Sequence, residues 1–133
     1  MPDSSYVDQR YPLSKLTSRI IAAATEVHRT LGPGFKEVIY QRALARELPV
    51  HDLECEREVE IDITYKGEVI GQRRVDFVIG DSTGDVMLEI KAKSGLEDVD
   101  FVQTLSYLKA SGYRVGLLIN FGSTRLEVRR LAN

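Results

Sequence analysis

The chain is poor in cysteine, with Cys55 alone among its 133 residues. One cysteine excludes an internal disulfide framework, a four-cysteine zinc site and a cysteine-ligated iron–sulfur cluster within one chain. A reducing, cytoplasmic setting is therefore the default expectation. The sequence also lacks any apolar run near the roughly 20 residues that cross a bilayer, so no membrane partner is expected.

A basic balance is missing as well, since 20 acidic residues outnumber 18 lysines and arginines and leave a net charge of −2. Proteins that hold DNA through its phosphates usually carry an excess of basic residues. Any nucleic-acid surface must therefore be local. For each basic residue taken singly, an ordinary solvated charge is the better interpretation. The residues available for such a surface are Arg73, Arg74, Lys91, Lys93, Lys109, Arg114, Arg125, Arg129 and Arg130.

The length suits one hydrophobic core and is too short for two. The polar N-terminus predicts a flexible leader over residues 1–12, followed by a single domain over residues 13–133. Apolar residues then recur every three or four positions up to Leu31, which predicts an amphipathic helix with Ser14 as its N-cap. A second helix is expected from about Phe35 to Leu48. Its predicted inward residues are Val38, Leu44 and Leu48.

Downstream the periodicity changes to two, which predicts a half-buried strand over residues 58–65, a tight turn at Lys66-Gly67, and further strands over residues 68–79 and 85–92. A third helix is expected from Asp98, closed by Gly112. Its predicted buried residues are Phe101, Val102, Leu105 and Leu108.

The apolar run from Val115 to Phe121 predicts a strand covered on both faces, and a short last strand is expected over residues 126–130. We therefore expect an α/β fold with one mixed sheet. Its first three strands form an antiparallel meander, and a helical crossover makes the fourth strand parallel to the third.

Strand geometry brings two carboxylates and an amine together. Glu89 and Lys91 are two residues apart and share a strand face. If Ile79 pairs near Asp85 or Val86, Asp76 lies beside Leu88 or Glu89. Paired carboxylates repel each other unless a cation lies between them. Their oxygens suit Mg²⁺, which can lower the pKa of a water that attacks a phosphate.

Spacing alone leaves other interpretations open. Glu89 and Lys91 could form a surface ion pair, with Asp76 as an ordinary acid at a strand end. Glu37 shares a helix face with Tyr40, yet it could be a first-turn acid that the helix dipole favours. A second helical pair, Gln103 and Tyr107, is also compatible with plain surface polarity.

Four segments carry a resemblance to a known family, namely LGPGFKEVIY, RVDFVI, MLEIKA and QTLSYLKASGYRVGLLINF. Together they closely resemble the GxxExxY family of small bacterial and archaeal proteins. That family belongs to the PD-(D/E)xK nuclease superfamily and is most similar to its RecB-type branch. The resemblance covers about Leu13 to Leu131, and it implies a restriction-endonuclease-like core flanked by helices.

The resemblance also implies a set of site residues. Its catalytic group is Glu37, Asp76, Glu89, Lys91 and Gln103. Asp76 and Glu89 would be metal ligands, helped by Glu37 and by the backbone carbonyl of Ile90. Lys91 would position or activate the attacking water, and Gln103 would hold Lys91 or contact the substrate.

Arg74 and Lys93 are predicted as phosphate contacts from their position alone, and Tyr107 and Tyr40 complete the predicted substrate-binding residues. One stretch departs from the family pattern, because Asp98-Val99-Asp100 stands where the family often has a histidine. This departure adds acids beside a proposed phosphate site.

The implied activity is that of a Mg²⁺-dependent nuclease acting on nucleic acid, expected to be DNA, with Mn²⁺ able to substitute. A non-catalytic nucleic-acid- or protein-binding module on the same fold is the alternative, because a fold does not by itself fix a function. A homodimer in which the second chain completes the substrate groove also stays open.

Overall fold

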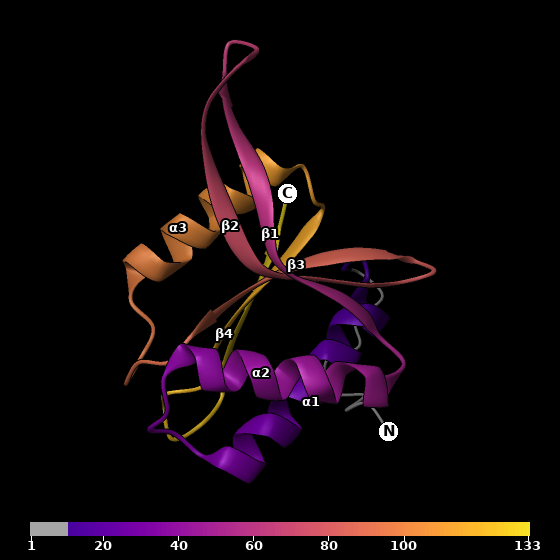
Figure 1. Ribbon diagram of the computed structural model, residues 1–133, viewed down its shortest axis with the longest axis vertical. Helices are drawn as coiled ribbons and strands as arrows, with labels where there is room; N and C mark the ends of the chain where they lie inside the picture. The colour runs from indigo at the N-terminus through magenta and orange to yellow at the C-terminus, as the bar shows by residue number, and fades with distance from the viewer. Residues whose placement is uncertain (1–10) are drawn as a thin grey trace.

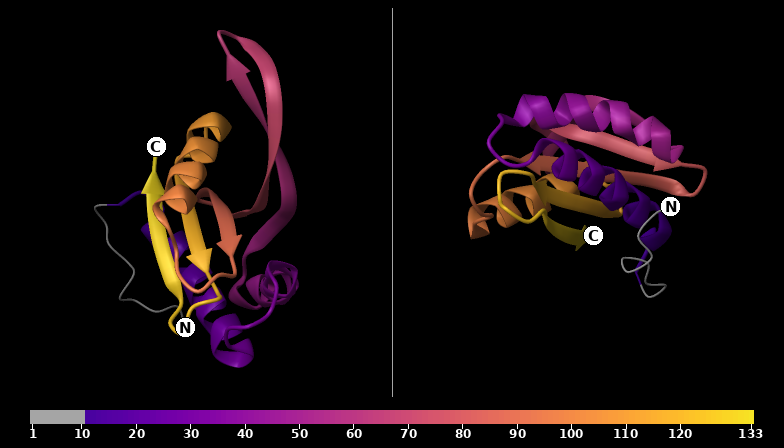
Figure 2. Two further views of the ribbon diagram at one scale, coloured as in Figure 1. Left: turned by 90° about the vertical axis from the view of Figure 1, so that its left-hand side faces the viewer. Right: turned by 90° about the horizontal axis from the view of Figure 1, so that it is seen from below.

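A computed structural model describes residues 11–133 as one five-stranded mixed sheet with helices on both faces (Figure 1). The strands lie in the order β1-β2-β3-β4-β5. Helices α1 and α2 cover one face and α3 covers the other (Figure 2). Residues 1–10 of the predicted leader lie outside the described residues. Within residues 11–133, none of the helices has the length and apolar character to cross a membrane.

The first helix, α1 (Ser14–Leu31), buries the predicted apolar face, including Ile20, Ala23 and Ala24. Ser14 was predicted to be the N-cap, but it is the first residue of the helix. The cap is Leu13, in the left-handed region at φ 57°, without a side-chain hydrogen bond. The Ser14 carbonyl accepts a hydrogen bond from the Thr17 hydroxyl instead.

The second helix, α2 (Glu37–Glu47), is shorter than predicted, because a 3-10 turn, η2 (Leu48–His51), follows it and includes Pro49. Proline lacks an N–H and is tolerated in a first turn, where no intrahelical partner is needed. Leu44 is buried as predicted. Val38 is 40% exposed, so its predicted inward position is wrong. The buried face instead carries Tyr40 and Gln41.

The three-strand meander is confirmed as β1 (Glu54–Tyr65), β2 (Glu68–Asp81) and β3 (Gly84–Lys91). Lys66 and Gly67 take φ 49° and 84°, as a two-residue hairpin turn of the I′ type requires. Strand β2 pairs with β1 from end to end, yet it pairs with β3 only from Phe77 to Asp81. The rest of the β1–β2 hairpin therefore projects from the body as a two-stranded ribbon (Figures 1 and 2).

Helix α3 (Asp98–Ser111) starts at the predicted residue and ends at Gly112, which has φ 77°. Its rotation differs from the prediction, because Phe101 and Val102 are 41% and 59% exposed. Thr104 is buried in their place, and Leu108 is buried as predicted. The Thr104 hydroxyl donates to the Asp100 carbonyl at 2.8 Å, so a polar residue can face the sheet without an unpaired group.

The last two strands are β4 (Val115–Asn120), parallel to β3, and β5 (Glu127–Ala132), antiparallel to β4. Every residue of β4 is buried, as the apolar run predicted. Along β3, Leu88 and Ile90 belong to the core under α1 and α2, whereas Met87 belongs to the core under α3. Because side chains alternate along a strand, Glu89 and Lys91 follow Met87 on the α3 side.

Candidate active site

Asp76 and Glu89 face each other where β2 leaves β3. The last pair of the ladder is Phe77 with Leu88, so Asp76 and Glu89 are the next positions along the two strands. Ile79 pairs with Val86, one of the two partners expected for it. The Ile90 amide donates to Asp76 Oδ2 at 2.7 Å, and the Asp76 amide donates to Glu89 Oε1 at 3.0 Å. Side chains thus accept the amides at the point where the two strands stop pairing.

Helix α2 supplies a second contact to the aspartate. Gln41 Nε2 donates to Asp76 Oδ1 at 2.9 Å, and Gln41 Oε1 accepts from the Arg57 guanidinium at 3.3 Å. The guanidinium also lies 5.9 Å from the centre of the Phe77 ring. Both Asp76 oxygens therefore accept an N–H, and these two hydrogen bonds restrict the orientation of the carboxylate.

The pair is electrostatically strained. The pKa of Glu89 is raised to about 8, chiefly by burial and then by the charge of Asp76. Burial also raises the pKa of Asp76, against the opposing effects of the Ile90 amide and the charge of Lys91. Asp76 receives more hydrogen bonds than Glu89, so the shared negative charge rests on Asp76 and the proton rests on Glu89 near neutral pH.

Glu37 belongs to the same electrostatic environment. Its pKa is raised by burial and by the charge of Asp76, and the charge of Lys91 lowers it. Its position is nevertheless more open, because it stands exposed in the first turn of α2. Within residues 11–133, no three His, Cys, Asp or Glu side chains are arranged to hold a metal ion. The structure therefore does not bring Glu37 into one ligand group with Asp76 and Glu89.

Two carboxylates remain, and they suit a divalent cation. Mg²⁺ commonly takes one or two protein carboxylates and fills its other positions with water and substrate oxygens. A cation between Asp76 and Glu89 would also relieve the repulsion that raises the pKa of Glu89. The residues present thus fit a hard, oxygen-seeking metal. The Ile90 carbonyl as a further ligand stays a prediction.

The two lysines at the end of β3 differ in their partners. Lys93 Nζ pairs with Glu97 at 2.6 Å and with buried Asp100 at 2.9 Å. No ion pair in the described part of the chain involves Lys91. The amine of Lys91 is therefore available for a water or a phosphate, whereas the amine of Lys93 is already neutralised.

Asp100 belongs to the stretch Asp98-Val99-Asp100, which departs from the family pattern, and it has a local structural role. Asp100 Oδ2 accepts the backbone amide of Glu97 at 2.9 Å, which completes a capping box at the start of α3. These contacts hold the pKa of Asp100 below its ordinary value, although burial opposes them. One of the added acids thus serves the helix cap and Lys93.

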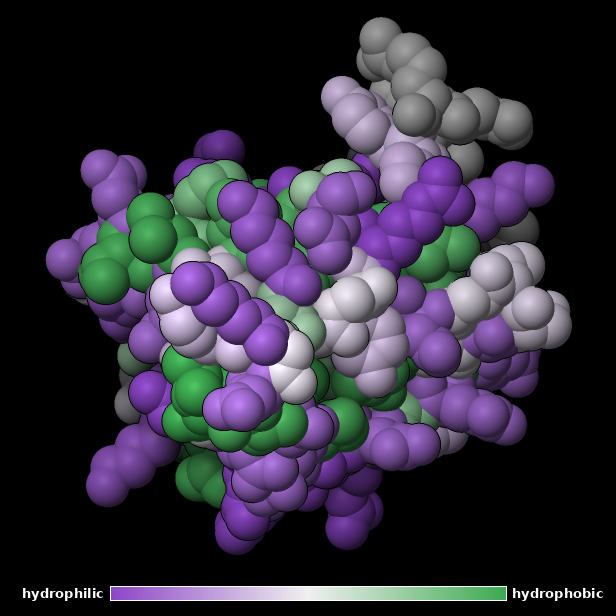
Figure 3. All heavy atoms as spheres, turned by 90° about the horizontal axis from the view of Figure 1, so that it is seen from above, coloured by the Kyte–Doolittle hydropathy of each residue, from purple (hydrophilic) through white to green (hydrophobic). Residues whose placement is uncertain are grey.

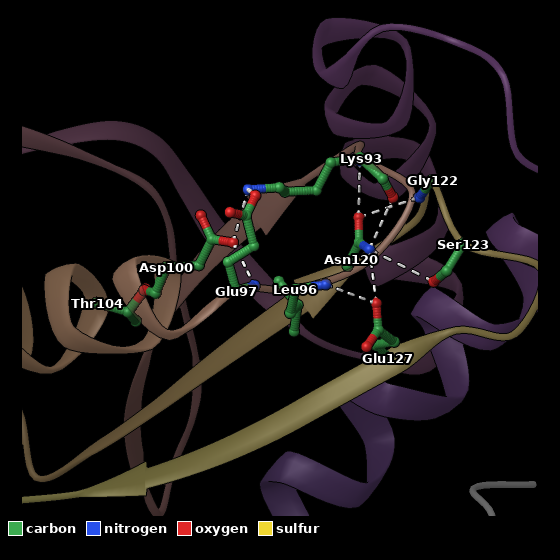
Figure 4. Close-up of polar contacts among 9 residues, drawn as sticks. All are labelled: Lys93, Leu96, Glu97, Asp100, Thr104, Asn120, Gly122, Ser123 and Glu127. Carbon is green, nitrogen blue, oxygen red and sulfur yellow. Dashed lines mark hydrogen bonds and ion pairs between the residues drawn. The ribbon is translucent and has the colours of Figure 1, made fainter.

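A polar cluster around Asn120 holds the loop after β3 (Figure 4). Asn120 is fully buried, and its Oδ1 accepts the amides of Lys93 at 3.0 Å and Gly122 at 3.1 Å. Its Nδ2 donates to the Lys93 carbonyl and to Glu127 Oε1, which also accepts the amide of Leu96. A Cβ at Gly122 would lie 2.3 Å from the Lys93 nitrogen, so only glycine permits this approach.

The predicted substrate residues occupy different places. Tyr40 is fully buried, stacks on Phe121, donates its hydroxyl to the Gly32 carbonyl at 2.6 Å and accepts the Phe35 amide. A substrate contact at Tyr40 is therefore wrong, because solvent does not reach its side chain. Arg74 is exposed on β2, with only loose ion pairs, at 4.0 Å to Glu58 and 3.6 Å to Glu60.

Helix α3 carries Gln103, predicted as catalytic, and Tyr107, predicted at the substrate. Gln103 is exposed and Tyr107 is half-buried. Within the described residues, no hydrogen bond joins Gln103 to Lys91, so a direct contact between them stays a prediction. Tyr107 instead lines a cavity between α3 and the β1–β2 hairpin.

Sequence reasoning missed Gln41, Arg57 and Asn120. A signal existed for Gln41, which lies one helical turn after Glu37 and therefore on the same face of α2. Arg57 and Asn120 act through contacts that are distant in sequence, with residues 16 and 27 positions away. Periodicity carries no information about such contacts.

Comparison with known proteins finds a matching family model and a similar solved structure. Residues 14–131 match the family model described as the PD-(D/E)XK nuclease superfamily. No curated protein matches the chain. A solved structure described as the crystal structure of SSO0001 is similar at a TM-score of 0.52 and 18% identity, covering 91% of this chain and 56% of that one. That likeness shows the fold alone, and this chain spans little more than half of that protein. The expected restriction-endonuclease-like fold is confirmed.

Proposed function

The chain belongs to the PD-(D/E)XK nuclease superfamily, and on this premise we propose that it hydrolyses phosphodiester bonds of nucleic acid with the help of Mg²⁺. Mn²⁺ is proposed as a substitute, since it prefers the same oxygen ligands. Within the superfamily, the segments around Glu37, Asp76 and Gln103 favour the GxxExxY family and the RecB-type branch. DNA in the cytoplasm is the proposed substrate.

One observation carries the proposal, namely the carboxylate pair of Asp76 and Glu89 at the divergence of β2 and β3. Glu89 is buried and Asp76 is half-buried, both accept backbone amides, and the pKa of Glu89 is raised to about 8. A surface ion pair between Glu89 and Lys91 does not have these properties. Strongly perturbed carboxylates in one cluster are typical of functional sites.

The chain's own residues divide the work. Asp76 and Glu89 would hold the cation, and Glu89 would give up its proton as it does so. When bound, a divalent cation polarises a phosphodiester oxygen and lowers the pKa of the attacking water. Lys91 would donate a hydrogen bond to that water or to the phosphate oxygen on which charge develops. Gln41 and Ile90 keep the Asp76 carboxylate in place throughout.

Glu37 and Arg74 have supporting parts in this proposal. Glu37 stands exposed in the first turn of α2, and the charges of Asp76 and Lys91 shift its pKa. It would therefore act on water or the substrate rather than as a third side-chain ligand. Arg74 is two residues from Asp76 and 66% exposed, so it can meet a phosphate of the substrate.

A non-catalytic binding module is the second candidate. It is favoured by the net charge of −2 and by the lack of a three-carboxylate ligand group within residues 11–133. The two candidates differ in one respect that is easily measured. A binding module would bind nucleic acid but form no cleavage product that depends on Lys91.

Incubation with single- and double-stranded DNA and RNA, in Mg²⁺ and in Mn²⁺, tests the proposal. Cleavage that disappears in Asp76→Asn and in Lys91→Ala is the expected result. Cleavage that persists in both variants would assign the activity to another site or to a contaminant. Binding without cleavage by the wild-type protein would favour the module.

A further inference from the structure

A groove lies between helix α3 and the projecting part of the β1–β2 hairpin. It has a volume of about 440 Å³, within the range of roughly 300–1,000 Å³ that is usual for small-molecule sites. Figure 3 looks down on the molecule from the hairpin end, where hydrophobic patches alternate with hydrophilic side chains. The lining residues are Ile63, Ile70, Gly71, Gln72, Arg73, Ser106, Tyr107 and Ala110.

Both walls of the groove belong to elements that also reach the candidate active site, namely β2 and α3. On β2, Arg73 is three residues from Asp76, and the intervening Val75 belongs to the core under α3. On α3, the charge of Lys91 is one of the causes that lower the pKa of Asp100 in the first turn. Tyr107 lies two turns further along the helix. A chain that leaves the carboxylate pair on the α3 side would therefore enter this groove.

The two walls offer complementary chemistry. Tyr107 on α3 supplies an aromatic side chain, and Ile63 and Ile70 supply apolar surface on the hairpin. Arg73 on β2 is exposed, so its guanidinium can meet a phosphate. An aromatic side chain with apolar surface suits a nucleobase, because every base has a face that stacks.

We propose that this groove holds one unpaired strand of the nucleic acid, with a base against Tyr107 and a backbone phosphate on Arg73. This inference rests on the proposed function and names its substrate class. In a duplex the base faces are covered by their neighbours, so a base reaches Tyr107 only when it is unstacked. The site therefore acts on single strands, or on single-stranded ends of a duplex.

A second hollow of similar size does not fit a polyanion. It has a volume of about 410 Å³, and carboxylates dominate its lining: Glu54, Glu56, Asp81 and Asp85. These acids would repel phosphates. They leave the α3–hairpin groove, with its arginine, as the better path for a nucleic-acid strand.

Binding of fluorescein-labelled oligonucleotides, measured by fluorescence anisotropy in EDTA, tests the groove without any cleavage. Unpaired DNA and RNA oligonucleotides of one length and the matching duplexes are the probes. We expect tighter binding to unpaired strands. Tyr107→Leu should weaken it by about 5- to 150-fold, the range for loss of one base-stacking aromatic. Arg73→Ala should reduce the slope of log affinity against log salt by about 0.7, as for one lost phosphate contact on a single strand.

Two further variants keep the test decisive if Tyr107→Leu folds poorly. Ser106 is exposed, so Ser106→Trp fills the groove without removing core atoms, and it should also weaken binding. Tyr107→Phe keeps an aromatic ring and should bind as the wild type does. Tyr11→Leu and Arg46→Ala are matched controls, because both residues are exposed and lie outside the groove.

The outcomes separate this inference from the proposed function. Equal affinity for unpaired strands and duplexes, or unchanged binding in both Tyr107→Leu and Ser106→Trp, overturns the groove even if Asp76-dependent cleavage is found. Tyr107-dependent binding without cleavage in Mg²⁺ supports the groove and overturns the nuclease. The tighter-bound of the two unpaired probes identifies DNA or RNA as the preferred strand.

Discussion

Asp76 and Glu89 each accept a hydrogen bond from the strand of the other, at 2.7 Å from the Ile90 amide and 3.0 Å from the Asp76 amide. Where two strands separate, their amides normally lose their partners and become costly to bury. Here the carboxylates replace the lost partners. The same contacts keep Glu89 buried beside Asp76, and its pKa is raised first by that burial and then by the charge of Asp76. The hydrogen bonds at the strand divergence and the closeness of the two carboxylates thus have one structural cause.

The stability of the metal-free protein should fall as the pH rises. The pKa of Glu89 goes from 4.5 to about 8 on folding, so the stabilising proton is fully present below the lower value and is lost as the pH passes the higher one. The free energy of unfolding in EDTA should therefore decrease by on the order of a few kcal/mol between about pH 5 and pH 8.5. Urea unfolding across this range measures the effect.

Glu89→Gln is the matched variant for that experiment. The glutamine keeps an oxygen for the Asp76 amide and does not ionise, so its unfolding free energy should depend less on pH than that of the wild type. At high pH the variant should be the more stable protein. The same steep pH dependence in both proteins would show that Glu89 is not the titrating group.

Divalent metal should stabilise the wild-type protein in the same window. Mg²⁺ or Mn²⁺ at about 100 times its dissociation constant should add about 2.7 kcal/mol to the free energy of unfolding. The gain should be absent in Asp76→Asn, because a neutral amide removes a ligand charge. Differential scanning fluorimetry with a metal titration measures this stabilisation. An equal stabilisation of Asp76→Asn would show that the metal binds at another site.

Gln41 should act as a positioning residue. Gln41→Ala removes the donor to Asp76 Oδ1, so the carboxylate loses one of its constraints. Metal affinity should fall by about 10- to 100-fold, as when other residues that orient metal ligands are changed. A higher metal concentration should restore much of the cleavage rate.

Arg42→Ala is the control for the Gln41 variant, since Arg42 is the next residue of the same helix and is exposed, whereas Gln41 is buried. It should leave the metal dependence of cleavage unaltered. If cleavage by Gln41→Ala depends on metal concentration as it does in the wild type, Gln41 has only a structural role.

The Asn120 cluster should matter for stability. Asn120→Ala would leave the part-buried amides of Lys93 and Gly122 without their acceptor, at a cost of up to about 1–3 kcal/mol for each unsatisfied group. Urea unfolding should therefore show a loss of several kcal/mol. Asn133→Ala, at an exposed position of the same residue type, should cost far less. Similar losses in both variants would contradict this role for Asn120.

Much of the site could be predicted from the sequence, because strand alternation and a short hairpin fix which residues are neighbours. The pairing of Ile79 with Val86 follows from the position of the turn, and it places Asp76 next to Glu89. The parallel fourth strand follows in the same way from the helix between β3 and β4. These features depend on local order along the chain.

Other features depend on contacts that no local pattern reports. The exposure of Phe101 and Val102 follows from the rotation of α3, at which Asp100, Thr104 and Leu108 are buried. The burial of Tyr40 follows from its stacking on Phe121, 81 residues later in the sequence, since 121 − 40 = 81. Such contacts arise only when the helices have packed on the sheet.

A single comparison tests the proposed catalysis most directly, namely cleavage of an unpaired oligonucleotide in Mg²⁺ by Lys91→Ala and Lys93→Ala. Both variants lose one amine at the end of β3, yet only Lys93 is already paired with two carboxylates. We predict that Lys91→Ala lowers the rate by about 100-fold or more, as for loss of one transition-state donor, and that Lys93→Ala keeps most of it. Equal rates in Lys91→Ala and the wild type would contradict a catalytic site built on Asp76, Glu89 and Lys91.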